Sequence, residues 1–189
     1  RVKIRIVSQR MSLLGQSKLL IAINKIITNS FLVSKMTSVS EGTQKYSIED
    51  QKINPEKILT IPNGIEIDKY SVLLNKNESN LLKNDFKIPQ ENKIIVTVAR
   101  LHPQKGHIYL LNAAKEIVKN HSKTSFLFIG DGELKEFLIR KVDQLGLNNN
   151  IIIAGAREDI PSILAISDIF VLPTLWEGMP NSILEAMAA

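Results

Sequence analysis

The sequence of 189 residues predicts an α/β protein whose sheet is parallel. Four short runs in its second half are almost entirely apolar, as expected for strands that are buried on both faces. Stretches with apolar residues at helical spacing separate these runs, and such alternation produces right-handed crossovers. The runs cover residues 94–99, 126–129, 151–154 and 169–172. Together these observations predict a Rossmann-like layer structure.

Three helices are predicted between these strands. Residues 107–120 place Leu110, Leu111, Ala114, Ile117 and Val118 on one face, and residues 133–145 follow the same rule. Residues 160–167 form a shorter third helix. Because ligands of such sheets bind beyond the carboxyl ends of the strands, polar residues that follow these strands are the candidate site residues.

The first half contains weaker signals. Residues 4–8, 37–39 and 58–61 are strand-like, and the last run leads into a Pro-Asn-Gly turn. Apolar residues recur at helical spacing from Leu13 to Ile27, and we expect this helix to pack on a sheet rather than on a membrane surface. Residues 69–92 are polar and are predicted to be a linker.

Composition narrows the function. The formal charge of +5 suits polyphosphate ligands, nucleic acid or an anionic membrane surface, but aromatic residues are too few, at 5%, for a base-stacking platform. Nucleic acid is therefore not an expected partner. The absence of cysteine excludes disulfides and thiolate catalysis, and it fits a cytoplasmic location. His102 and His107 have no third ligand nearby in the sequence, so no metal site is predicted.

A loop and a predicted helix follow the last strand, with Glu177 before the helix and Glu185 within it. Pro180 suits the first helical position, which leaves the amides of Asn181 and Ser182 at the helix mouth. Such amides attract phosphate, whereas carboxylates accept hydrogen bonds from hydroxyls. A sugar nucleotide carries both groups.

Two cations follow the first predicted strand of the second half. Pro103 and Gly106 favour a turn that lets Arg100 and Lys105 converge, where they would neutralise a diphosphate. After the next strand, Gly130-Asp131-Gly132 resembles the start of a dinucleotide fingerprint, but Lys135 stands where its third glycine would be. We therefore interpret this turn as structural first.

The spacing of the two glutamates resembles the E-x7-E signature of retaining glycosyltransferases of the GT-B fold, in the large family called group 1 or GT4. Arg100 and Lys105 are similar to the Arg and Lys that hold the donor diphosphate in that family. The Val39-Ser40-Glu41 run and the later Ile61-Pro62-Asn63-Gly64-Ile65 run resemble the last strands of its N-terminal domain.

The resemblance implies a domain organisation. Residues 1–68 would be the remnant of the acceptor-side domain and residues 69–92 the linker. Residues 93–189 would be a C-terminal nucleotide-sugar-binding domain, truncated at its end. The chain, which begins with Arg1 and ends within a predicted helix, would then be a piece of a longer protein.

The resemblance also implies an activity. A hexosyl residue would move from a nucleotide-diphosphate sugar, a UDP-sugar, to a glycan or lipid-linked acceptor with retention, at the inner membrane face and without a metal or other cofactor. Glu177, Arg100 and Lys105 would be catalytic. The donor would also contact Gly130, Arg157, Gly178, Met179, Asn181, Ser182 and Glu185. A non-catalytic nucleotide-sugar-binding relative and a nucleotide-dependent oxidoreductase remain as alternatives.

Overall fold

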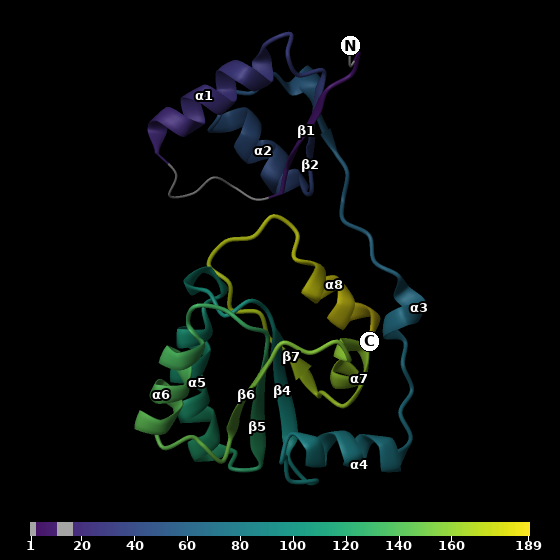
Figure 1. Cartoon of the computed structure of the whole chain (residues 1–189), viewed down its shortest axis with the longest axis vertical. Coiled ribbons are helices and arrows are strands. Elements are labelled where there is room, and N and C mark those ends of the chain that lie inside the picture. Colours follow the sequence, from purple (N-terminus) through teal and green to yellow (C-terminus); the bar gives the residue numbers. More distant parts are fainter. Residues whose placement is uncertain (1–2, 11–16) are drawn as a thin grey trace. The chain divides into compact units, whose positions relative to one another are not determined.

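The computed structural model describes residues 3–10 and 17–189, and these residues fall into two compact units (Figure 1). Unit 1 comprises Arg1–Gly64 and Trp176–Asn181. Unit 2 comprises Ile65–Leu175 and Ser182–Ala189. The boundary at Gly64 lies four residues before the predicted one.

Unit 1 contains a small parallel sheet with the strand order β1-β2-β3. Its elements are β1 (Ile6–Gln9), α1 (Lys18–Asn29), β2 (Lys35–Ser38), α2 (Glu41–Glu49), a 3-10 turn (Pro55–Lys57) and β3 (Ile58–Thr60). Met36 on β2, Ile53 and Ile58 form its core, so little apolar surface is buried here. All three strands overlap the predicted runs.

Helix α1 is oriented differently from our expectation. Its polar side faces unit 1, where Thr28 is buried and the Asn24 amide donates to the Gln51 side chain at 2.9 Å. Five large apolar residues of the helix are exposed instead, so the expected packing of its apolar face on a sheet is wrong; they are Leu19, Leu20, Ile23, Ile26 and Ile27. Leu13 and Leu14, which share the pattern, lie outside the described residues. None of the helices in the described ranges is long and apolar enough to cross a membrane.

Unit 2 is built on a four-stranded parallel sheet with the order β6-β5-β4-β7, which confirms the predicted α/β class. Its strands are β4 (Lys93–Val98), β5 (Thr124–Ile129), β6 (Ile151–Gly155) and β7 (Ile169–Phe170). Its helices are α3 (Ile67–Tyr70), α4 (Lys76–Asp85), α5 (His107–Asn120), α6 (Lys135–Gln144), α7 (Ile160–Ala165) and α8 (Asn181–Ala188), the last beginning in unit 1. A 3-10 turn, η2 (Pro103–Lys105), precedes α5.

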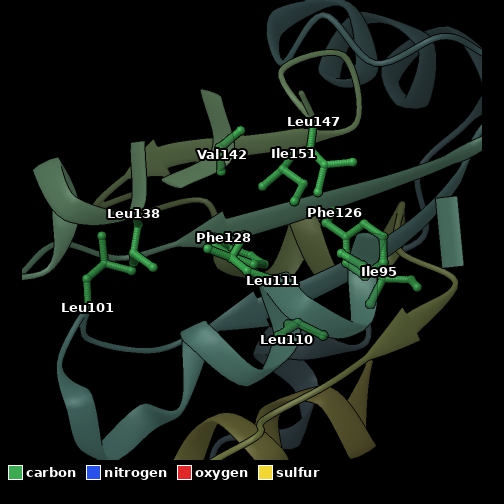
Figure 2. Close-up of a cluster of buried hydrophobic side chains, with 11 residues drawn as sticks. Ile95, Leu101, Leu110, Leu111, Phe126, Phe128, Leu138, Val142, Leu147 and Ile151 are labelled. Atoms are coloured by element: carbon green, nitrogen blue, oxygen red, sulfur yellow. The ribbon is translucent and has the colours of Figure 1, made fainter. Parts of the chain in front are cut away.

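Helices cover both faces of this sheet. On one face, α5 and α6 enclose a cluster that includes Leu111, Phe126, Phe128 and Leu138, all fully buried (Figure 2). On the other face, Ile163 from α7 packs with buried residues of β4 and β5. The sheet is therefore held between two apolar layers, which fixes the ends of its strands in space.

The predicted linker is structured. Helix α4 begins with a capping box in which the Asn75 side chain accepts from the Glu78 amide and Glu78 accepts from the Asn75 amide. Tyr70, Phe86 and Ile88 are buried in the second apolar layer of unit 2. The prediction of a polar linker over residues 69–92 is thus wrong, because its few apolar residues are the ones that pack.

Candidate functional site

The order of the strands marks one place on the sheet of unit 2. β5 and β6 are added successively on one side of β4, and the chain then crosses to the other side to form β7. Ligands of open α/β sheets bind at such a reversal, beyond the carboxyl ends of the strands. The loops that follow β4 and β7 are therefore the candidate ligand-binding loops.

The loop after β4 carries the two predicted cations. Arg100 is exposed two residues beyond the strand, and its guanidinium forms no ion pair within residues 3–10 and 17–189. The η2 turn follows, with the Nδ1 atom of His102 accepting from the Gln104 amide at 3.2 Å. Lys105 ends this turn and is half-buried. Both cations thus lie at the carboxyl edge of the sheet.

Gly106 joins this loop to the segment after β7. Its φ of 71° is left-handed, and a Cβ placed there would lie 1.9 Å from the Pro173 carbonyl oxygen. The Gln104 carbonyl also accepts from the Leu175 amide at 2.8 Å and from the Thr174 hydroxyl at 3.0 Å. The cation loop and the segment that leads to Glu177 are therefore fastened together by backbone contacts that leave no room for a side chain at position 106.

The Gly130-Asp131-Gly132 turn after β5 lies beside the same loop. A Cβ on Gly130 would lie 2.0 Å from the Ala99 carbonyl oxygen, and the Leu101 amide donates to the Asp131 carbonyl at 2.9 Å. The Gly132 amide and the Lys135 ammonium hold the pKa of the Asp131 carboxyl below its usual range. This geometry supports the structural interpretation of the turn. A direct contact of Gly130 with a ligand stays a prediction.

His107, the first residue of α5, is fully buried and stacks edge-on against Phe128 at 5.4 Å between ring centroids. Neither ring nitrogen has a hydrogen-bond partner in the described part of the chain. Burial, together with the charge on Lys105, lowers the pKa of the imidazole to about 4. At neutral pH this histidine is therefore uncharged, and it adds no positive charge to the cation loop.

The first part of the glutamate segment belongs to unit 1. Glu177 is half-buried there, and a Cβ on Gly178 would lie 2.1 Å from the Arg10 carbonyl oxygen. The Asn63 amide group donates at 2.8 Å to the Met179 carbonyl and to the Asn181 side chain. Helix α8 begins at Asn181, one residue later than expected, so Pro180 immediately precedes the helix.

The second glutamate lies in unit 2. Glu185 is half-buried, and burial followed by interaction with this carboxylate raises the pKa of the buried Tyr70 of α3. Tyr70 was not predicted as a site residue, because it lies at the start of the predicted linker. An aromatic residue in a polar stretch was the available signal.

Arg157 follows β6, and its guanidinium makes several contacts within unit 2. Its guanidinium pairs with Asp159 at 2.8 Å and with Asp85 at 3.1 Å, and it lies 4.9 Å from the centre of the Phe86 ring. The hydrogen bond with Asp159 is the main reason why the pKa of Arg157 is raised. These contacts tie α4 to the β6–α7 loop. The predicted contact of Arg157 with the nucleotide stays a prediction.

A cavity of about 550 Å³ lies at the opposite, amino end of the sheet, between Lys93, Ile117 and Lys123. The strand reversal loops lie at the other ends of the same strands, and the rule for open sheets favours that carboxyl edge. Within the described ranges, no three His, Asp or Glu side chains gather as metal ligands. Metal-independent chemistry stays a prediction.

Comparison with a family model gives a match over residues 78–189, and the family is described as glycosyl transferases group 1. A UDP-Gal:alpha-D-GlcNAc-diphosphoundecaprenol alpha-1,3-galactosyltransferase of Escherichia coli is 40% identical over 159 residues. That alignment covers 82% of this chain and 40% of the E. coli protein. An uncharacterized glycosyltransferase of Methanocaldococcus jannaschii is 33% identical over 70% of this chain and 32% of its own. The chain thus spans well under half the length of these relatives.

Solved structures share the fold. The Anabaena protein HepE, crystallised in complex with UDP-glucose, has a TM-score of 0.85 and 22% identity over 97% of this chain and 50% of its own. The C-terminal domain of a group 1 glycosyl transferase from Francisella tularensis, LpcC, has a TM-score of 0.57 and 28% identity over 67% of each chain. Both are α/β proteins to which this chain is similar in architecture.

Proposed function

This chain belongs to the group 1 glycosyl transferase family, and on that premise we propose that the protein containing it transfers a hexosyl residue from a UDP-sugar to a glycan or lipid-linked acceptor, with retention at the anomeric carbon. The E. coli relative is named for a UDP-Gal donor and a lipid diphosphate acceptor, and the Anabaena structure contains UDP-glucose. Both names support this choice of donor class.

One observation carries the proposal. Arg100 and Lys105 lie on a loop at the strand reversal, and Gly106 and Gln104 fasten that loop to the segment preceding Glu177. A diphosphate is the ligand that two fixed cations at this edge would bind best. The exposed guanidinium of Arg100 is suited to two parallel hydrogen bonds with phosphate oxygens.

The proposed chemistry follows from these charges. The bond between the anomeric carbon and the diphosphate oxygen breaks, and its electron pair leaves with UDP. An acceptor hydroxyl oxygen forms the new bond to the anomeric carbon, and the hydroxyl proton passes to a phosphate oxygen of the departing UDP. Arg100, Lys105 and the amides of Asn181 and Ser182 stabilise the negative charge that develops on the diphosphate. They do so without a metal ion. Glu177 binds sugar hydroxyls, and Glu185 binds the ribose hydroxyls of the nucleotide.

The test uses the complete protein with radiolabelled UDP-glucose, UDP-galactose and UDP-N-acetylglucosamine, and a lipid diphosphate acceptor. Arg100→Ala and Lys105→Ala should each lower kcat/KM by a factor that corresponds to about 2 kcal/mol or more. Arg140→Ala and Lys119→Ala remove exposed cations from α6 and α5 and should leave transfer unchanged.

Two further measurements distinguish the alternative functions. Donor binding without turnover would favour the non-catalytic relative, and spectroscopic binding of NADH without UDP binding would favour the oxidoreductase. Transfer should persist in EDTA. Loss of transfer in EDTA and its recovery with Mg²⁺ or Mn²⁺ would show that the protein cations alone do not stabilise the leaving diphosphate.

A further inference from the structure

The turn that leads from Glu177 into α8 is bound by Asn63, which lies in the Pro-Asn-Gly segment after β3. The Asn63 side-chain amide donates to the Met179 carbonyl and to the Asn181 side-chain oxygen, both at 2.8 Å, across 116 and 118 residues of chain. The Asn63 main-chain amide donates to the Met179 sulfur at 3.3 Å. Asn63, Met179 and Asn181 all belong to unit 1. Every N–H group of Asn63 is therefore directed to this turn.

The two side-chain hydrogen bonds of Asn63 lie on either side of Pro180. Because proline has no N–H group, residue 180 cannot donate a hydrogen bond that would fix the turn. Met179 accepts immediately before the proline, and Asn181 accepts immediately after it. Both partners are acceptors, so the contact requires a group with two protons, which an asparagine supplies and a carboxylate does not. Asn63 thus fixes the direction in which the chain enters α8.

Asn63 is itself anchored by the sheet of unit 1. Strand β3 ends at Thr60, whose hydroxyl lies 2.9 Å from the Ser38 hydroxyl of β2. The Ile61 amide then donates to the Ser38 carbonyl at 2.8 Å. Pro62 follows and restricts the backbone on both sides of itself. The side chain of Asn63 is therefore presented from a fixed position at the carboxyl end of β3.

The carboxyl ends of β1 and β2 support the same turn. A Cβ on Gly178 would lie 2.1 Å from the Arg10 carbonyl oxygen and 2.8 Å from the Val39 side chain. Arg10 directly follows β1, and the buried Val39 directly follows β2. The backbone at position 178 therefore lies against both residues. The turn over residues 178–181 thus rests on the carboxyl ends of β1, β2 and β3.

We propose that Asn63 is a positioning residue for the donor nucleotide. It acts through Met179 and Asn181, which set the direction of α8, and this helix carries the first amides and the Glu185 carboxylate that bind the donor in the proposed function. The inference rests on that proposed function. A misdirected helix start weakens the contacts with the diphosphate and the ribose whatever sugar is attached. Loss of the Asn63 side chain should therefore weaken the binding of UDP itself.

The test measures UDP binding to the complete protein by isothermal titration calorimetry, together with transfer. Asn63→Ala should raise the dissociation constant of UDP about tenfold and lower kcat/KM for the UDP-sugar by a similar factor. The matched control is Asn24→Ala, because Asn24 is also a half-buried residue of unit 1 and its amide donates to the Gln51 side chain at 2.9 Å. The control should lower the melting temperature about as much as Asn63→Ala does and leave UDP binding unchanged.

A double-mutant cycle tests the route of the effect. Asn181→Ala removes the side-chain acceptor of the Asn63 amide and keeps the main-chain amide at the start of α8. Because the two residues act through one contact, the double variant should bind UDP more tightly than the product of the two single effects predicts.

Three results would overturn the proposal. The first is normal UDP binding with impaired transfer in Asn63→Ala, which would mean that Asn63 contacts the sugar or the acceptor. The second is an equal loss of UDP binding in Asn63→Ala and Asn24→Ala, which would indicate a general loosening of unit 1. The third is a double variant whose effect equals the product of the two single effects.

Arg100→Ala separates this role from the proposed function. Normal UDP binding in Arg100→Ala would contradict the donor site itself. Weakened UDP binding in Arg100→Ala, with normal binding in Asn63→Ala, would contradict only the role of Asn63.

Discussion

The interaction of Tyr70 with Glu185 is the residue-scale feature that bears most directly on the proposed donor site. A carboxylate that binds ribose hydroxyls needs a fixed direction, and a buried phenol supplies one. Because burial and Glu185 both raise the pKa of Tyr70, the phenol keeps its proton at neutral pH and remains a donor. Tyr70 would then be a positioning residue for Glu185.

Tyr70→Phe should raise the KM for the UDP-sugar about tenfold while kcat stays within about twofold, because losing the interaction of the phenol hydroxyl with a charged carboxylate should cost about 1.5 kcal/mol. The ring is retained, so the melting temperature should change little. Steady-state kinetics of the complete protein measure this, with Tyr109→Phe on exposed α5 surface as the control. An unchanged KM would show that Glu185 does not need Tyr70 for its position.

Contacts between individual side chains are also the features that the sequence predicts least well. The spacing of Glu177 and Glu185 and the position of Arg100 after a strand could be recognised from local patterns. The partners of Arg157 could not, because Asp85 lies 72 positions earlier, in a segment predicted to be unstructured. Long-range ion pairs leave no periodic signal in a sequence.

At the scale of elements, the β4–η2–α5 connection depends on a glycine that satisfies two conditions at once. Gly106 adopts a left-handed φ of 71°, and it also lies against the Pro173 carbonyl oxygen. Gly146 has a similar φ of 68°, but a Cβ there would meet no atom within 4 Å. Substituting each of these two glycines therefore distinguishes the cost of the left-handed conformation from the cost of the steric contact.

Gly146→Ala should lower the free energy of unfolding by about 1 kcal/mol, from the left-handed conformation alone. Gly106→Ala should lower it by about 3 kcal/mol or more, because the backbone must also move away from Pro173. That movement displaces Lys105, so kcat/KM should fall as well. Urea unfolding and transfer assays measure both effects. Equal losses of stability in the two variants would contradict the proposed steric role.

The buried imidazole at the start of α5 gives the element a dependence on pH. The pKa of His107 falls to about 4 in the folded state, while the unfolded chain has the ordinary value near 6.5. The unfolded state therefore binds a proton first, and the folded state loses stability as the pH falls from about 6.5 toward 4.

His107→Leu should remove this loss, so its stability relative to the wild type should rise by about 3 kcal/mol between pH 7 and pH 4. The measurement is urea unfolding across this range. His121→Leu changes an exposed histidine and should follow the wild-type curve. Parallel curves for His107→Leu and the wild type would mean that the imidazole is not protonated on unfolding.

Elements were predicted unevenly, for a physical reason. Residues 107–120 form the predicted helix because their apolar residues recur at the helical period and pack on the sheet. Helix α4 was not predicted because most of its residues are polar, so its few apolar residues show no clear helical periodicity. The Asn75-x-x-Glu78 capping box was nevertheless a recognisable sign of a helix start. Helix α1 was predicted from its period, but a period does not reveal which side faces the protein.

On the scale of the whole molecule, the strand order decides where the site lies. Apolar runs predicted four strands, but nothing local in the sequence indicates that β7 pairs with β4 rather than with β6. That pairing brings the two loops of the proposed donor site to adjacent strands. Since ligand binding to the folded state stabilises the fold, the whole molecule should respond to donor nucleotide.

UDP at about a hundred times its dissociation constant should stabilise the complete protein by about 2.7 kcal/mol and raise its melting temperature by a few degrees. NADH should produce no shift. Combining Arg100→Ala with Lys105→Ala should abolish the UDP shift, which differential scanning fluorimetry can detect. A shift of normal size in this double variant would place the diphosphate elsewhere.

The position of β7 also has a consequence for how the molecule folds. Thr97 donates to the Val171 carbonyl across 74 residues of chain, whereas β5 and β6 join the sheet through short crossovers. Closing a long loop costs entropy before any contact repays it, so nonlocal strand pairs form late. The cation loop would then exist before its partner segment arrives. The nascent chain would therefore be unable to bind a diphosphate fully until β7 has paired with β4.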